Sequence, residues 1–175
     1  DEEKEYPVVF FMHGYLGNWK LYNGVLKDLE DCIVMGVGTH DLSGIFSHKD
    51  ISELFTRQLP FLEKLGMKAD KDNLHIIGLS NGGSAVNVAY NSFSLKFKTI
   101  TFISTGIYQT HPIRSKVLLI GGGKDASSGS MPGAYNRLKR NGTKVDKYWQ
   151  EDEGHFIFVN DRNEIVEFLN KNIHA

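Results

Sequence analysis

The chain has 175 residues, of which 41% are hydrophobic and 23% are charged, and its 20 basic and 21 acidic side chains nearly cancel. This length predicts one domain with its own hydrophobic core. The balanced charge, without a basic stripe, argues against a nucleic-acid partner. No apolar run approaches the roughly 20 residues that a membrane-spanning helix needs, so no transmembrane segment is expected.

We expect residues 1–6 to form a polar leader and residues 7–175 to form the single domain. If Asp1 follows a removed signal peptide, the protein is secreted or periplasmic, and otherwise it is cytoplasmic. Cys32 is the sole cysteine, which excludes an internal disulfide, and we expect a buried, unreactive thiol in a strand. The sequence does not indicate an oligomeric state.

Short β-rich apolar runs alternate with segments of helical periodicity. The expected strands are 7–12, 32–37, 73–79, 99–104, 116–120 and 144–149. The expected helices are 51–65 with a kink at Pro60, 84–90, 134–140, and 161–172 with Asp161 as N-cap. This alternation predicts an α/β fold of about six mostly parallel strands with helices on both faces. Ligands of such sheets bind beyond the carboxyl ends of the strands.

The third expected strand ends in Gly78-Leu79-Ser80-Asn81-Gly82 and leads into a helix. Glycines that flank a serine at a strand-to-helix junction allow a sharp turn, which lifts the hydroxyl above the sheet. The pattern therefore predicts Ser80 as a nucleophile. The alternative is an ordinary glycine-rich turn, since glycine and serine are common in turns.

The first expected strand runs into His13-Gly14-Tyr15. Acyl transfer needs two backbone N–H groups that face the developing oxyanion. The residue after the nucleophile, Asn81, is expected to supply one of them and Tyr15 the other. His13 is a weaker candidate for a catalytic base, because a histidine before this glycine is expected to bond to the loop backbone.

A carboxylate and a histidine follow the last two expected strands. Asp125 lies just past the fifth strand and is expected to orient the imidazole of His155, which lies in the next loop. Histidine exchanges protons near neutral pH, so His155 is the expected general base. Rival acids stand closer to His155 along the chain, namely Glu151, Asp152 and Glu153.

These motifs occur in the order serine, aspartate, histidine, each at a strand end, and together they resemble the α/β-hydrolase superfamily over nearly the whole chain. The chain is similar to the small lidless bacterial lipases and esterases, because the segment 104–116 is too short for the helical cap of larger members. The resemblance implies a minimal α/β-hydrolase with an exposed, shallow site and no cap domain. The consecutive glycines before Lys124-Asp125 are a departure from the family pattern.

The resemblance and the serine nucleophile imply a serine hydrolase that cleaves small-molecule carboxylic esters of short to medium acyl groups. Alternatives on the same triad are a thioesterase, a deacetylase of sugar esters and a peptidase; an inactive hydrolase fold used as a binding module is a further one. No cofactor and no metal are expected. Side chains that could contact the substrate are Trp19, Tyr22, His40 and Met131.

Overall fold

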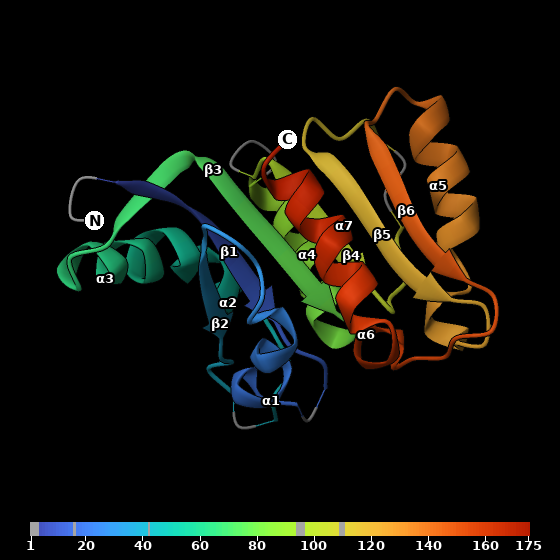
Figure 1. Cartoon of the computed structure of the whole chain (residues 1–175), viewed down its shortest axis with the longest axis horizontal. Coiled ribbons are helices and arrows are strands. Elements are labelled where there is room, and N and C mark those ends of the chain that lie inside the picture. Colours follow the sequence, from blue (N-terminus) through green and yellow to red (C-terminus); the bar gives the residue numbers. More distant parts are fainter. Residues whose placement is uncertain (1–3, 16, 42, 94–96, 109–110) are drawn as a thin grey trace.

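The protein is described by a computed structural model that covers residues 4–15, 17–41, 43–93, 97–108 and 111–175 (Figure 1). Six strands form one sheet in the order β2-β1-β3-β4-β5-β6, and every neighbouring pair is parallel. The strands are β1 (Glu5–Met12), β2 (Ile33–Val37), β3 (Lys68–Leu79), β4 (Thr99–Ile103), β5 (Lys116–Gly122) and β6 (Val145–Gln150). The prediction of an α/β fold with about six parallel strands is confirmed.

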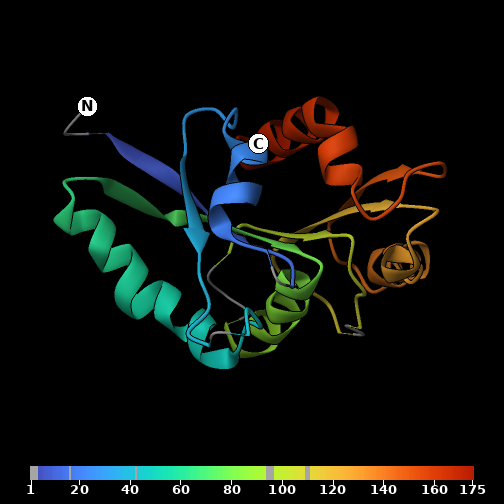
Figure 2. The same cartoon turned by 90° about the horizontal axis from the view of Figure 1, so that it is seen from below.

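Helices cover both faces of the sheet (Figure 2). One face carries α2 (His48–Glu53), α3 (Leu59–Lys64), α4 (Asn81–Phe93) and α5 (Met131–Arg140). The other carries α1 (Trp19–Asn23), α6 (Ile157–Asn160) and α7 (Arg162–Ile173). Short helical turns complete the chain at Gly24–Leu26, Leu54–Gln58 and Ala126–Ser128. Among the described residues, no helix is long and apolar enough to cross a membrane.

Strand β1 shows why the sheet needs two helical layers. Its side chains alternate between two buried clusters, with Phe10 on the α2–α5 side and Phe11 on the α6–α7 side. Both rings are fully buried, as expected for a parallel strand covered on both faces. The continuous apolar runs in the sequence follow from this double coverage.

Several element bounds differ from those expected. Strand β1 begins at Glu5, two residues before the expected start at residue 7, because Glu5 and Tyr6 pair with Lys68 and Ala69. Asp161 precedes α7 but makes no side-chain capping bond. Its carboxylate instead accepts a hydrogen bond from the Tyr148 hydroxyl at 2.9 Å.

The helical segment on the α2–α3 side is continuous but irregular. A π-helical turn, Leu54–Gln58, joins α2 to α3, and Pro60 lies in the first turn of α3. Proline has no backbone N–H to donate to the preceding turn, and the wider π-turn accommodates the missing hydrogen bond. The irregularity in this segment lies in the turn directly before the predicted position at Pro60.

Cys32 lies just before β2 rather than inside it, and its side chain is half-buried. Burial, together with the nearby Asp31 carboxylate, raises the pKa of the thiol to about 11. The thiol is therefore protonated and weakly nucleophilic near neutral pH.

His75 is buried inside β3. Its ring nitrogens lie 2.7 Å from the Thr99 hydroxyl and 3.0 Å from the Asn73 side-chain oxygen. Burial, and secondarily the charges of Lys98 and His174, lower its pKa to about 3. The folded protein therefore holds this imidazole neutral, whereas the unfolded chain protonates it near pH 6.5.

This difference predicts a pH-dependent stability. The contribution of His75 to the free energy of unfolding is present above about pH 6.5. It is lost as the pH falls toward about 3, because only the unfolded state binds the proton in this range. Between pH 7 and 5 the loss is about 2 kcal/mol. Urea unfolding of the wild type and of His75→Gln at both pH values measures it, and the variant should lack this part of the decline. Equal declines in both proteins would contradict the assignment.

Candidate active site

Ser80 stands between the last residue of β3 and the first residue of α4, in a strained turn. Its φ is +51°, in the left-handed region that costs a non-glycine residue about 1–3 kcal/mol. Its backbone N–H donates to the Ile103 carbonyl at 2.9 Å, which ties the turn to the end of β4. Non-glycine strain of this kind is concentrated at functional sites.

The glycines around Ser80 allow three pieces of backbone to meet. A Cβ on Gly82 would lie 2.1 Å from the carbonyl oxygen of Met12, at the end of β1. A Cβ on Gly78 would lie 2.5 Å from the carbonyl oxygen of Gly82. Both contacts are with backbone atoms, which cannot rotate away as a side chain can. The G-x-S-x-G spacing is thus a steric requirement of this turn.

The loop after β1 lies directly beside Ser80. A Cβ on Gly14 would lie 3.5 Å from the Cβ of Ser80, so the chain from Gly14 to Tyr15 borders the nucleophile. His13 is buried, and its Nδ1 donates to the Gly14 carbonyl at 2.8 Å. His13 therefore bonds to its own loop, as the sequence analysis expected.

Asn81 opens α4, and the first N–H groups of a helix lack intrahelical acceptors. The positive end of the helix dipole also lies at this position. The side-chain oxygen of Asn81 accepts a hydrogen bond from the Phe46 N–H at 3.3 Å, which joins the loop after β2 to the nucleophile turn. These features favour a developing negative charge beside residue 81.

Asp125 and His155 form a hydrogen-bonded pair. Nδ1 of His155 lies 3.1 Å from Oδ1 of Asp125, whose side chain is buried. Asp125 also accepts from the Ser127 N–H at 3.0 Å and from the Ser128 hydroxyl at 2.6 Å. Burial alone would raise the pKa of Asp125, but these three hydrogen bonds outweigh it and lower the pKa. The carboxylate is therefore ionised at neutral pH.

The rival acids bond to other groups. Asp152 is almost fully exposed and pairs with Lys124 at 3.2 Å. Glu151 accepts from the Trp149 indole N–H at 2.7 Å, and Glu153 accepts from the Asn160 amide at 2.8 Å. Asp125 is accordingly the carboxylate that bonds to His155 in this structure.

The consecutive glycines before Asp125 have a steric explanation. A Cβ on Gly122 would lie 2.2 Å from the Glu153 carbonyl oxygen, and a Cβ on Gly123 would lie 2.5 Å from the Glu151 carbonyl oxygen. The loop that carries His155 thus packs backbone to backbone against the loop that carries Asp125.

Ser104 is a further residue at this site that sequence reasoning missed. Its buried hydroxyl donates to the His155 carbonyl at 2.9 Å, and its φ is +49°. The strained end of β4 therefore holds the backbone of His155. A serine at a strand end is too common for the sequence to single it out.

Ser80 and His155 line one cavity of about 210 Å³. The other residues in its wall are Gly14, Tyr15, Tyr22, Leu79, Phe156 and Phe158. Among the described residues no hydrogen bond yet joins the Ser80 hydroxyl to His155. Such contacts are often long in unliganded enzymes and shorten on substrate binding.

The four expected substrate-contact residues do not all lie at the cavity. Tyr22 lines the cavity, but three others do not. Met131 is fully buried against Gly121 in the α2–α5 core, and Trp19 packs over Gly36 of β2. His40 pairs with Glu53 at 2.8 Å in a separate hollow. Sequence reasoning did not identify Leu79, Phe156 and Phe158 as cavity residues, although Phe156 directly follows His155.

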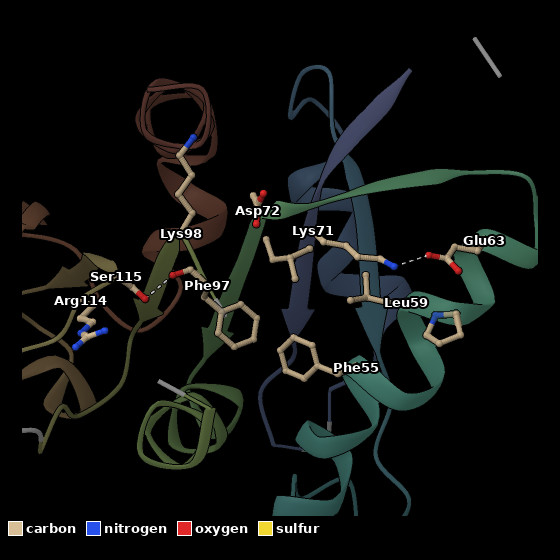
Figure 3. Close-up of a pocket in the computed structure, with 11 residues that line it drawn as sticks. Phe55, Leu59, Glu63, Lys71, Asp72, Phe97, Lys98, Arg114 and Ser115 are labelled. Atoms are coloured by element: carbon tan, nitrogen blue, oxygen red, sulfur yellow. Dashed lines mark hydrogen bonds and ion pairs between the residues drawn. The ribbon is translucent and has the colours of Figure 1, made fainter. Parts of the chain in front are cut away.

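A larger hollow of about 790 Å³ lies at the opposite edge of the sheet (Figure 3). Its wall includes Lys98, Arg114 and Ser115, which precede β4 and β5. This hollow lies at the amino ends of the strands, whereas Ser80 follows the carboxyl end of β3. Size alone therefore does not mark the site. No group of three or more His, Cys, Asp or Glu side chains placed to hold a metal occurs in the described ranges.

No protein-family model matches the chain, and no curated protein sequence matches it. Solved structures do. A Bacillus cereus carboxylesterase is 20% identical with a TM-score of 0.71, over 98% of this chain and 90% of that one. A ferulic acid esterase is 15% identical with a TM-score of 0.73, over 99% and 88%. A Mesorhizobium loti carboxylesterase is 16% identical with a TM-score of 0.72, over 95% and 89%.

These similarities establish the α/β-hydrolase fold for nearly the whole chain. No helix lies between β4 and β5 in the residues that the structure describes, so no cap domain is apparent. The names of these three structures describe esterases.

The hydrogen bonds at Asp125 predict the effect of two neighbouring substitutions. Ser128→Ala removes the side-chain donor and should raise the pKa of Asp125, because the ionised form loses a charge-assisted bond. Ser127→Ala should leave it unchanged, because Ser127 donates through its backbone. Carbon-13 NMR titration of the Asp125 carboxyl measures both. An equal pKa in Ser128→Ala and wild type would refute the role of the hydroxyl.

Proposed function

We propose that the protein is a serine hydrolase that cleaves small-molecule carboxylic esters of short to medium acyl groups through an acyl-enzyme. The observation that carries the proposal is the shared cavity of Ser80 and His155, together with the Asp125 carboxylate bonded to the imidazole at 3.1 Å. The esterase activity in the names of the similar structures supports it.

In the first half of the proposed reaction, Ser80 Oγ attacks the ester carbonyl carbon while its proton passes to Nε2 of His155. The Tyr15 and Asn81 amides donate to the tetrahedral oxyanion. The intermediate collapses, the bond to the alkoxide breaks, and the leaving oxygen takes the proton from Nε2. The acyl group remains on Ser80.

In the second half, a water molecule attacks the acyl carbon and gives its proton to Nε2. Collapse of this second intermediate returns the proton to Ser80 and releases the carboxylic acid. Asp125 accepts from Nδ1 throughout, which holds Nε2 toward the nucleophile and stabilises the imidazolium. The chemistry needs proton transfer and oxyanion stabilisation, which side chains and amides of this chain supply.

The first test is active-site labelling. A fluorophosphonate probe should label the folded wild type at Ser80, because the activated hydroxyl displaces fluoride from phosphorus. Ser80→Ala should not be labelled, and Ser84→Ala, which alters an exposed serine one helical turn further along, should be labelled as the wild type is. A folded wild type that resists the probe would instead favour a binding module.

The second test separates Asp125 from its nearest rival. Asp125→Asn should lower kcat by about 10⁴-fold, because an amide can no longer fix the required tautomer of His155. Asp152→Asn should change kcat less than threefold, because its exposed pair with Lys124 lies outside the site. Steady-state ester hydrolysis measures both. A large loss in Asp152→Asn with little loss in Asp125→Asn would reassign the acid.

A further inference from the structure

The cavity beside Ser80 has a wall rich in aromatic side chains. Four of its eight lining residues carry phenyl or phenol rings, namely Tyr15, Tyr22, Phe156 and Phe158. None of the eight carries a carboxylate, an ammonium or a guanidinium group. A charged acyl group would therefore lose its hydration there without gaining an ionic partner.

The inner part of this wall is held in place. Phe158 is buried and stacks on Phe11, with ring centroids 5.8 Å apart and an interplanar angle of 20°. The Tyr22 ring lies 6.5 Å from both of these rings. A Cβ on Gly17 would lie 2.2 Å from the Tyr22 ring, so the ring occupies space that only a glycine leaves open. We define these two rings, Tyr22 and Phe158, as the aromatic floor.

The outer part of the wall is open to solvent. Tyr15 and Phe156 are the exposed aromatic residues of the cavity, with 56% and 61% of their surfaces accessible. The Phe156 ring meets His155 edge-on, at 5.8 Å and 84°. The cavity therefore has exposed aromatic rings beside the imidazole, whereas in the aromatic floor Phe158 is buried and Tyr22 is partly buried.

The volume limits what enters. A cavity of about 150 Å³ lined by apolar side chains holds one benzene molecule, and this one measures about 210 Å³. Sites for drug-sized ligands start near 300 Å³. The space therefore accommodates one ring with a short arm.

The two halves of an ester have different needs at this site. The alcohol leaves in the first step, past His155, whose side chain is 36% accessible. The acyl group stays bonded to Ser80 until water attacks. The less exposed aromatic floor is therefore suited to the acyl half, and the exposed rings of Tyr15 and Phe156 to the departing alcohol.

We propose that the preferred acyl group is a small, uncharged aromatic group, of the benzoyl or cinnamoyl class, whose ring packs against the aromatic floor. This inference rests on the proposed function. Offset or edge-on contacts of a substrate ring with Tyr22 and Phe158 add attraction beyond the area buried. A flexible aliphatic chain of equal volume gains only the burial and loses more conformational freedom.

Methyl esters test the acyl preference without an aromatic alcohol. Methyl benzoate and methyl cinnamate should be hydrolysed with kcat/KM at least tenfold above methyl hexanoate and above monomethyl succinate, followed in a pH-stat. Benzyl acetate, which carries the ring in its alcohol, should rank with the aliphatic esters. Equal or better hydrolysis of the hexanoate or of benzyl acetate would overturn the proposal.

Variants locate the preference. Tyr22→Leu should lower the benzoate-to-hexanoate ratio of kcat/KM about tenfold, because it replaces a ring of the floor. Tyr108→Leu, a matched change at an exposed tyrosine outside the cavity wall, should leave the ratio as in the wild type. An unchanged ratio in Tyr22→Leu would overturn the assignment to the floor.

Fluorophosphonate labelling distinguishes a failure of the aromatic acyl site from a failure of the proposed hydrolase function. A protein that is labelled at Ser80 but prefers aliphatic acyl groups keeps the proposed function and refutes the aromatic acyl site. A folded protein that is neither labelled nor active on any ester refutes both. A cooperative thermal unfolding transition in Tyr22→Leu shows that a lost preference is not a loss of folding.

Discussion

The close approach of helix α4 to the end of strand β1 is the contact on which the site depends. It exists because Gly82 has no side chain at the point where the Met12 carbonyl would meet a Cβ at 2.1 Å. The helix can then begin directly above the strand end, which forces Ser80 into its left-handed conformation. The same approach sets Gly14, and with it the loop after β1, against the serine.

The other half of the site is built by a second close approach. Gly122 and Gly123 let the loop after β6 lie on the loop after β5, backbone against backbone. This contact brings His155 to Asp125, while Ser104 holds the His155 carbonyl from the end of β4. The parallel sheet joins the two halves, because the loops after β1, β3, β4, β5 and β6 all emerge at its carboxyl edge.

Much of this was predictable from the sequence. The strands could be predicted because burial on both faces leaves continuous apolar runs. The Ser80 turn could be predicted because its close backbone contacts restrict two positions to glycine. The positions of side chains that depend on contacts between residues far apart in the sequence could not be predicted. Nothing local distinguishes a Met131 that fills space over Gly121 from one that faces a ligand. Helices α1 and α6 have five and four residues, too few for a periodic pattern. The placement of Phe158 required knowledge of its contact with Phe11.

We propose that Ser80, His155 and Asp125 act together to form a covalent acyl-enzyme. Rapid acid quench of the protein with an activated ester, followed by peptide mass spectrometry, tests it most directly. We expect an acyl adduct on the peptide that contains Ser80 in the wild type, and none within the same time in His155→Ala. Ester turnover with the adduct on another residue, or an adduct that forms equally fast without His155, would rule out this joint role of the three residues.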